Sequence, residues 1–249
     1  MQKPGLRSIL MITVFLAVVS PVSGWAAIIN ATDSGWWSSG GFHSSDIKNY
    51  FVGGGGPLDD HNYFVFDLSG VSGTVVSATL RLENPSGGYG SPDPAETYTI
   101  FDVTTPVATL SASDSGAAAI DIYSDLGSGM ILGSSVVSAT NNGSIVQVTF
   151  SAAGLAYLQG ASGRLVAVGG ALTSLDTNLN TVEFLFGGTD ASNVRQLDIQ
   201  TTPVTQPVPE PATALMILSG FIVSNCRRIR FVPRAARRRS LWRPTRRSG

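Results

Sequence analysis

The 249-residue sequence has little cysteine, histidine or charge, and each shortage excludes a class of protein. The single cysteine, Cys226, excludes both a disulfide framework and a multi-cysteine zinc site. The chain has two histidines, His43 and His61, and charged residues make up 13% of it. A hydrophobic fraction of 43% is nevertheless too high for a disordered chain. The sequence therefore predicts a folded protein that needs no covalent cross-link.

The charges that are present are segregated along the chain. Ten of the 16 basic residues follow position 226, and Lys3 and Arg7 lie near the N-terminus. Between residues 27 and 207, four basic residues stand against 16 acidic ones, which gives this segment a net charge of −12. A surface of that sign repels phosphate groups, so the segment is not expected to bind nucleic acid.

The N-terminus has the three parts of a secretory signal peptide. Basic residues open the chain, an apolar run covers residues 9–19, and Pro21 is followed by small residues at Gly24 and Ala26. As a helix the apolar run would rise about 16 Å, roughly half of a bilayer's hydrocarbon thickness, so a permanent anchor is disfavoured. We expect a signal peptide over residues 1–26, export through the secretion translocon and cleavage after Ala26.

The C-terminus has a second three-part pattern, preceded by a linker over residues 204–208. Pro209, Glu210 and Pro211 are followed by an apolar segment, residues 212–223, and then by ten arginines beginning with Arg227 and Arg228. The prolines exclude helix before residue 212, and the arginines end the apolar run. Because a basic cluster after an apolar segment stays on the cytoplasmic side, the pattern predicts a short hydrophobic helix and a transient inner-membrane intermediate.

This pattern resembles the PEP-CTERM sorting signal of exported proteins in Gram-negative bacteria. The resemblance implies that an exosortase, a membrane protease or transpeptidase, recognises Pro209, Glu210 and Pro211 and removes residues 209–249. It also implies that the mature protein reaches the cell surface or the extracellular matrix. Residues 212–226 would form about 22 Å of helix, which suits a transient signal better than a permanent span. The arginine-rich tail from Arg228 to Gly249 is longer than the tails of that family.

The segment between the two signals is predicted to be an all-β domain over residues 27–203. Its apolar residues come in short alternating runs separated by Gly, Ser, Asn, Asp and Pro; in the clearest run every second residue from Val76 to Leu82 is apolar. A helix is expected over residues 151–159, capped by Ser151, and the Asn142-Gly143 pair predicts a tight hairpin within residues 136–146. With no ten-residue helix and no fixed-period repeat, the pattern favours a two-sheet β-sandwich, most simply a jelly roll. The predicted strands are 49–52, 62–66, 74–83, 97–103, 119–123, 144–150, 165–168, 182–186 and 196–200.

Part of this domain has a second resemblance. The segments Asn49-Tyr-Phe-Val-Gly53, Asn62-Tyr-Phe-Val-Phe-Asp-Leu-Ser69, Val75-Val-Ser-Ala-Thr-Leu-Arg-Leu82 and Tyr98-Thr-Ile-Phe-Asp-Val-Thr104 resemble the opening of DNRLRE-type jelly-roll domains. Those domains are extracellular β-sandwiches associated with carbohydrate-binding modules and surface proteins. Val65 stands where that family usually carries an arginine. The resemblance implies the fold but no binding residue.

Trp36 and Trp37 are the candidate ligand-binding residues. They lie close to Phe42 in a segment rich in glycine and serine. Exposed aromatic faces stack on the apolar faces of sugar rings, which favours glycan binding. The alternative is that both tryptophans plug one end of the sandwich, because large aromatic side chains are usually mostly buried.

Acidic segments are the candidates for metal binding and for catalysis. Asp59-Asp60-His61 and the segment from Ser91 to Glu96 offer oxygen ligands to Ca²⁺, although turn formation explains the same residues and neither has EF-hand spacing. A triad using His61 with Asp59 or Asp60 lacks a Gly-x-Ser-x-Gly serine, and the sequence sets no separation for a pair of glycosidase carboxylates. We expect no catalytic residue and no cofactor, with structural Ca²⁺ at Asp59 and Asp60 as an open alternative.

Together these observations predict a non-enzymatic, exported protein with an adhesive, matrix or weak glycan-binding role. Extracellular polysaccharide would then be its partner. Since the domain is acidic, binding of an acidic polysaccharide would require bridging divalent cations. The alternative is a carbohydrate-active enzyme, a glycosidase or lyase, on a jelly-roll scaffold.

Overall fold

A computed structural model describes residues 25–55, 57–176 and 181–203. The predicted signal helix up to residue 24, the linker and the sorting signal with Pro209, Glu210, Pro211, Arg227 and Arg228 lie outside these residues. In the described part of the chain, every helix is too short or too polar to cross a membrane.

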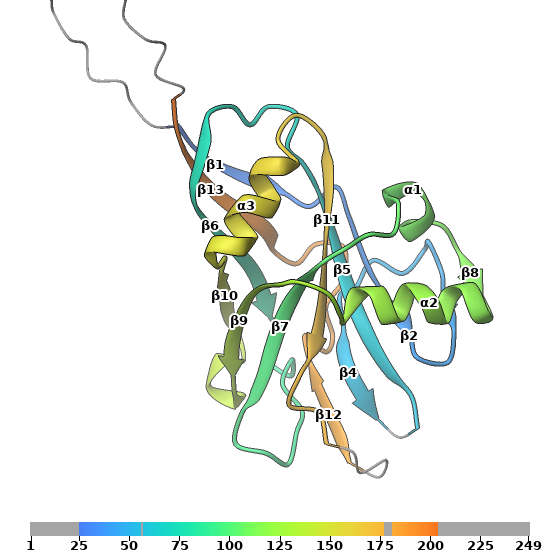
Figure 1. Cartoon of the computed structure of the whole chain (residues 1–249). Helices are drawn as coiled ribbons and strands as arrows, with labels where there is room; N and C mark the ends of the chain where they lie inside the picture. The colour runs from blue at the N-terminus through green and yellow to red at the C-terminus, as the bar shows by residue number, and fades with distance from the viewer. Residues whose placement is uncertain (1–24, 56, 177–180, 204–249) are drawn as a thin grey trace, which may run out of the picture. The chain divides into compact units, whose positions relative to one another are not determined.

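Strands dominate the described residues, and three α-helices and one 3-10 turn connect some of them (Figure 1). In chain order the elements are β1 (Trp25–Asn30), β2 (Asp33–Ser38), β3 (Phe42–His43), β4 (Val52–Gly55), β5 (Asp59–Asp67), β6 (Thr74–Asn84), β7 (Glu96–Asp102), α1 (Val107–Leu110), β8 (Asp114–Ser115), α2 (Ala117–Leu126), β9 (Ile131–Val137), η1 (Ala139–Asn141), β10 (Ser144–Thr149), α3 (Ala152–Gly160), β11 (Leu165–Leu172), β12 (Val182–Leu185) and β13 (Arg195–Thr202).

The strands form two antiparallel sheets, which confirms the predicted all-β sandwich. One sheet has the order β1-β13-β6-β10, and the other has the order β8-β3-β2-β5-β11-β7-β9, with β4 paired to β5 and β12 to β4. Among the longer strands, β1 pairs with β13, β5 with β11, β6 with β10 and β7 with β9. Counted in chain order among these eight strands, the first pairs with the last, the second with the next to last, and so on inward, as in one long hairpin rolled into two layers. This is the jelly-roll arrangement. Strands β2, β3, β4, β8 and β12 extend the larger sheet beyond β5.

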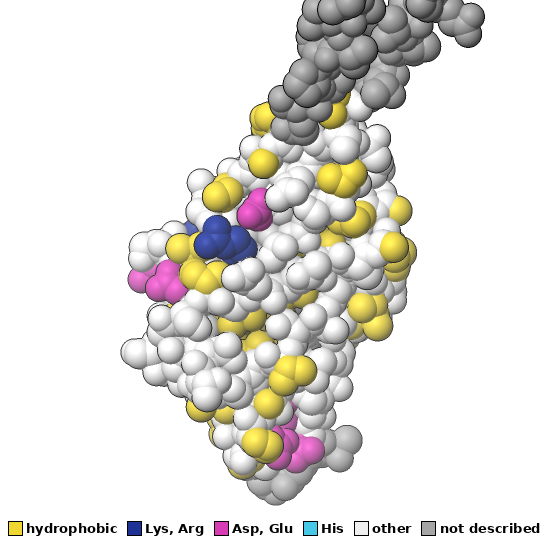
Figure 2. Space-filling model, turned by 90° about the vertical axis from the view of Figure 1, so that its left-hand side faces the viewer, with side chains coloured by type: hydrophobic (Ala, Val, Ile, Leu, Met, Phe, Trp, Pro, Cys, Tyr) yellow, Lys and Arg dark blue, Asp and Glu magenta, His cyan; other side chains and the backbone are white. Residues whose placement is uncertain are grey.

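Two hydrophobic clusters hold the layers together. The larger cluster fills the space between the sheets and includes Tyr50, Phe64, Phe66, Tyr98 and Phe186. The smaller cluster lies on the opposite face of the β5–β11 region, where α1 and α2 cover the sheet, as Figure 1 shows. The surface in Figure 2 carries few charged side chains and scattered hydrophobic ones, in keeping with the low charge of the sequence.

The alternation predicted in β6 is shifted at one end by a β-bulge. Leu80 and Leu82 are buried as expected, but Val76 is exposed and Val75 is buried in its place. The register explains the change, because Ser77 lies opposite Gln200 while Val75 lies opposite Thr201, so Val76 is the extra residue. An extra residue reverses the facing of the side chains beyond it.

Residues 119–123 form part of helix α2 rather than the predicted strand, so the expectation of no ten-residue helix is also wrong. The alternation of Ile120 and Ile122 suggested a strand, but Ala119, Ile122 and Leu126 are the residues that α2 buries. Their spacing of three and four residues is helical, and the alanines that open the segment have the highest helix propensity.

The predicted hairpin within residues 136–146 is also absent. Gly143 has the positive φ expected of the Asn-Gly pair, at 71°. The strands on either side belong to different sheets, however, because β9 pairs with β7 while β10 pairs with β6. The turn therefore carries the chain across the sandwich. The predicted helix α3 is confirmed, and the Ser151 hydroxyl accepts a hydrogen bond from the Gly154 amide at its N-terminus.

The ends of the sandwich lie close to the predicted domain limits. Trp25 and Ala26, assigned from sequence to the signal peptide, occupy the first two positions of β1, opposite Thr201 and Gln200. Cleavage after Ala26 would thus shorten β1 without removing a core side chain, since Trp25 is exposed. At the other end, β13 ends at Thr202, one residue before the predicted limit of the domain at residue 203.

Candidate functional site

The two adjacent tryptophans lie on β2, and their side chains point to opposite faces of the sheet, as successive strand residues do. Trp37 is 0% exposed in the smaller cluster beneath α1 and α2. Its indole Nε1 donates to the Leu110 carbonyl oxygen at 3.2 Å, and its ring stacks on His43 with centroids 4.5 Å apart. Trp37 therefore has no face on which a sugar ring could stack, which corrects the stacking prediction for this residue. Its role is to pack the helices against the sheet.

Trp36 faces the other side of β2 and lies nearer the surface. It is half-buried, and its Nε1 donates to the Asn49 side-chain oxygen at 3.1 Å. The neighbouring ring is Phe42, with centroids 6.2 Å apart and planes inclined at 49°. Phe42 is 48% exposed, so the accessible aromatic face at this edge belongs to Phe42, with Trp36 beside it.

Phe42 forms one wall of a shallow surface depression, which we call the aromatic hollow. Strand β3 places Phe42 opposite Ser115 and His43 opposite Asp114 of β8. The Ser45 amide donates to the Ser113 hydroxyl at 2.8 Å, which fixes the other side of the depression. The residues that line the hollow are Phe42, His43, Ser44, Ser113, Asp114 and Ser115. An aromatic face thus adjoins hydroxyl and carboxylate groups.

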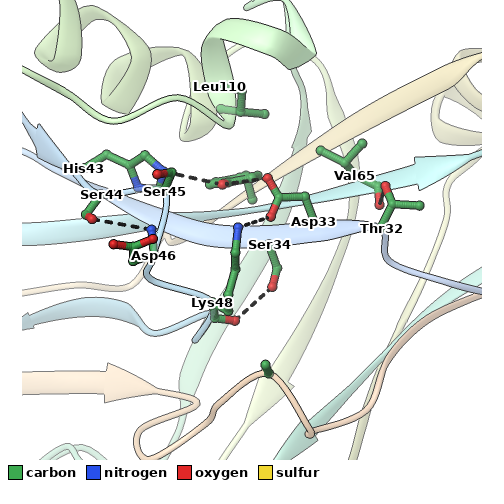
Figure 3. Close-up of polar contacts among 12 residues, drawn as sticks. Thr32, Asp33, Ser34, His43, Ser44, Ser45, Asp46, Lys48, Val65 and Leu110 are labelled. Atoms are coloured by element: carbon green, nitrogen blue, oxygen red, sulfur yellow. Dashed lines mark hydrogen bonds and ion pairs between the residues drawn. The ribbon is translucent and has the colours of Figure 1, made fainter.

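Polar contacts fix the segment behind the hollow to β2 (Figure 3). The Lys48 ammonium lies 2.7 Å from Asp33 Oδ1, and the Ser34 hydroxyl donates to the Lys48 carbonyl oxygen at 3.0 Å. His43 Nδ1 lies 2.7 Å from the Trp36 carbonyl oxygen, so Nδ1 carries the proton. These contacts hold Phe42 and Trp36 in place before any ligand arrives.

The electrostatics of this segment follow from burial and from the Lys48 ion pair. Burial on its own would raise the pKa of Asp33, but hydrogen bonds from Lys48 and Ser111 and the Lys48 charge bring that pKa below its ordinary value. Burial lowers the pKa of His43, which keeps the ring neutral at pH 7. The pair therefore retains its charges while the ring beside it carries none.

Asp59 and Asp60, the residues proposed for Ca²⁺, begin β5 and point away from each other. Asp59 accepts a hydrogen bond from the Tyr123 hydroxyl of α2, whereas Asp60 lies on the opposite face beside Ser38. Burial is the main reason that the pKa of Asp60 is raised to about 7. His61 stacks on Tyr123 with centroids 3.9 Å apart, and its Nδ1 lies 2.8 Å from the Tyr123 carbonyl oxygen. A backbone carbonyl rather than an aspartate therefore orients His61, which disfavours a catalytic triad.

The acidic residues that do converge are Asp93, Glu96 and Glu183, which we call the acidic cluster. Within the described residues they form the one group of three potential metal-binding side chains, with ligand atoms all within 4.8 Å of one another. Asp93 and Glu96 belong to the second segment considered for Ca²⁺ from the sequence. Glu183 comes from β12, far along the chain, and only the fold brings it to the other two.

The sequence matches no protein-family model, and no curated protein matches it significantly. The function of the chain is therefore inferred from the side chains of the aromatic hollow and the acidic cluster.

Proposed function

We propose that the chain is an exported, non-enzymatic protein of the cell surface or extracellular matrix that binds polysaccharide weakly through the aromatic hollow. The observation that carries this proposal is the exposure of Phe42, an aromatic ring 48% open to solvent beside Trp36. A large aromatic residue normally leaves water when the chain folds, so a ring held at the surface by fixed neighbours is a candidate contact residue.

The chemistry of the hollow suits a sugar ring. The faces of a pyranose are lined with C–H groups that pack on an aromatic ring, while its hydroxyls need donors and acceptors around the edge. Ser44, Ser113 and Ser115 offer both, and Asp114 offers acceptors. Because one exposed ring and a shallow depression bury little of a ligand, the affinity per site is expected to be low. Many weak contacts to one polymer chain would add up through avidity.

Delivery to the outside is the second part of the proposal, and the sequence alone supports it. The signal peptide would direct the chain to the translocon, and an exosortase-type enzyme would act at Pro209, Glu210 and Pro211. The test is mass spectrometry of the mature C-terminus in producing cells, with the unaltered sequence and with Pro209→Ala/Pro211→Ala. Cleavage near residue 209 that is lost in the double variant supports sorting through this signal. An intact C-terminus in both would refute it.

Glycan binding is tested by co-sedimentation of the mature protein with the producing organism's extracellular polysaccharide, with and without Ca²⁺. Phe42→Leu keeps an apolar side chain but removes the flat face, so we expect the dissociation constant to rise about 2- to 13-fold, the equivalent of about 0.5–1.5 kcal/mol. Phe42→Trp keeps the face and should bind at least as well as the unaltered protein. Val136→Ala is the matched control, since Val136 is an exposed apolar residue at 67% exposure on β9.

This role is refuted if Phe42→Leu, Phe42→Trp and the control variant all bind the polysaccharide equally well.

The enzymatic alternative is tested in the same samples by measuring the release of reducing sugar or unsaturated ends. Asp60 has the pKa of a general acid, about 7, but Asp59 points to the other face of β5 and cannot serve as its partner. Polysaccharide cleavage that Asp60→Asn abolishes would establish the alternative.

A further inference from the structure

Three carboxylates from separate parts of the chain meet where β7, β12 and the loop before β7 come together. Glu96 is the first residue of β7, Glu183 lies on β12, and Asp93 lies in the connecting loop between β6 and β7. The ligand oxygens of all three lie within 4.8 Å of one another. Glu96 is 0% exposed and Glu183 is 1% exposed, while Asp93 is half-buried.

Hydrogen bonds satisfy three of the four glutamate oxygens and leave one without a partner. Glu96 accepts from the Ser91 hydroxyl at 2.5 Å through Oε1 and from the Ser174 hydroxyl through Oε2. Glu183 Oε2 accepts from the Asp176 amide at 2.8 Å. Glu183 Oε1 is buried and has no hydrogen-bond partner. A buried acceptor without a donor costs about 1–3 kcal/mol, and more when it is charged, so this oxygen marks a place for a ligand.

The basic side chains of the described residues do not balance the charge of the cluster. Within residues 25–55, 57–176 and 181–203, no lysine, arginine or histidine nitrogen lies within 4.0 Å of an oxygen of these three carboxylates. Like charges at this separation and burial repel strongly. A cation bound between the three carboxylates would offset this repulsion.

We propose that the acidic cluster is a binding site for a divalent metal ion, and that the ion is Ca²⁺. The available ligands are carboxylate and hydroxyl oxygens, which suit Ca²⁺ or Mg²⁺, whereas zinc sites are typically built from cysteine and histidine. Ca²⁺ accepts six to eight oxygens in irregular geometry and binds carboxylates through one or both oxygens. Mg²⁺ demands a regular octahedron and retains several waters, which two buried glutamates disfavour.

The backbone places the loop that carries Asp93 over β12. Gly90 forms an isolated β-bridge with Phe184, in which the Gly90 amide donates to the Phe184 carbonyl oxygen at 3.0 Å and the Phe184 amide donates back at 2.7 Å. A Cβ at position 90 would lie 2.4 Å from the Phe184 ring, so the approach requires glycine. Bound Ca²⁺ would cross-link this loop, β7 and β12 in a domain that has no disulfide.

The first experiment follows thermal unfolding of the full chain in a mild non-ionic detergent, in EDTA and with rising CaCl₂ or MgCl₂. Because a ligand that binds only the folded state stabilises it, Ca²⁺ at about 100 times its dissociation constant should raise Tm by about 5–10 °C. Mg²⁺ at the same concentration should raise it less. No shift with Ca²⁺ would overturn the proposal.

A second measurement reports on the site itself. The Tyr89 hydroxyl donates to the Asp93 carbonyl oxygen at 2.5 Å, so its ring lies beside the cluster. Tb³⁺, which replaces Ca²⁺ in oxygen sites, emits when a nearby aromatic ring transfers energy to it. We expect Tb³⁺ emission that Ca²⁺ displaces and that Tyr89→Phe reduces. Emission that Tyr89→Phe leaves unchanged would place the ion elsewhere and refute this site.

Variants separate metal binding from a purely structural role of the glutamate. Glu183→Gln removes one of the repelling charges, so in EDTA it should unfold at the same temperature as the unaltered chain or higher, while its Ca²⁺ response is lost. Asp93→Asn, at the half-buried position, should weaken Ca²⁺ binding at least tenfold without unfolding the chain. Asp121→Asn, an exposed carboxylate on α2, is the control and should keep the full response.

The competing explanation is a proton shared between the carboxylates. In that case Tm would rise as the pH falls, Ca²⁺ would have no effect, and Glu183→Gln would only remove the pH dependence; that pattern would overturn the proposal. The site uses no residue of the aromatic hollow. Loss of polysaccharide binding in Phe42→Leu with an intact Ca²⁺ response would leave this inference standing, and the converse would leave the glycan proposal standing.

Discussion

Trp36 and Trp37 are adjacent residues of one type that differ in burial, and this difference gives the strongest prediction. Trp37→Ala should destabilise the protein far more than Trp36→Ala. Trp37 lies wholly inside the smaller cluster, donates to the Leu110 carbonyl oxygen and stacks on His43. Trp36 is half-buried at the edge of the sheet, and its hydrogen bond goes to the side chain of Asn49.

The contacts of each ring set the size of the difference. Replacing a fully buried tryptophan with alanine leaves a cavity and costs about 3–5 kcal/mol. For Trp36 the loss is part of a ring's burial and one half-buried hydrogen bond, about 1–2 kcal/mol. In a domain of this size each kcal/mol lowers Tm by about 2–4 °C, so we expect a fall of about 6–20 °C for Trp37→Ala and about 2–8 °C for Trp36→Ala.

The assay is urea and thermal unfolding followed by far-ultraviolet circular dichroism, with both variants measured beside the unaltered chain. Equal slopes in urea would show that each variant unfolds from the same compact state, so that the midpoints compare directly. A Trp37→Ala variant as stable as Trp36→Ala would refute the packing of α1 and α2 described above. It would also return Trp37 to the set of candidate glycan-binding residues.

Three further predictions test separate parts of the fold. Burial raises the pKa of Asp60 from 3.8 to about 7, so the folded state binds the proton more tightly than the unfolded state does. The free energy of unfolding should therefore fall by up to about 4 kcal/mol as the pH rises from 4 to 7. Asp60→Asn should remove this pH dependence in urea titrations. Gly169→Ala should cost about 1–3 kcal/mol, because a Cβ there would lie 2.4 Å from the Leu126 carbonyl oxygen of α2; an unchanged urea midpoint would contradict that contact. Ser151→Ala removes the N-cap of α3 and should cost about 1 kcal/mol, which Ser151→Asp should largely restore.

The sandwich was predictable because its strands follow a local rule. A half-buried strand shows its alternation within its own residues, and this pattern located most of β5, β6, β7, β10, β12 and β13 and the first half of β11 from the sequence. Helix α3 was predictable for a similar reason, since Ser151 caps its first turn. Local sequence patterns failed where pairing with another strand decides which side chains are buried. The bulge that exposes Val76 depends on the register with β13. Because that register is not encoded in the residues of β6 alone, the bulge could not be predicted from them.

The candidate sites were predictable in residue type but not in arrangement. The tryptophans stood out in the sequence, yet sequence reasoning could not say which of the two faces the core, because the facing of β2 depends on where α2 packs. Phe42 was seen only as a neighbour of the tryptophans. The signal for Glu183 is weaker still, since a lone glutamate within an apolar strand gives no indication of its partners.

Composition and order along the chain determined by themselves that residues 27–207 are free of cysteine and acidic and that they favour β-strands, since these properties are sums or local patterns. Tertiary structure decided which aromatic ring stays in water and which carboxylates meet. Asp93 and Glu96 are close in sequence, but Glu183 reaches them only because β12 pairs with β4 at one edge of the larger sheet. Long-range pairing is fixed by the packing of the whole domain, so the cluster exists only in the folded chain.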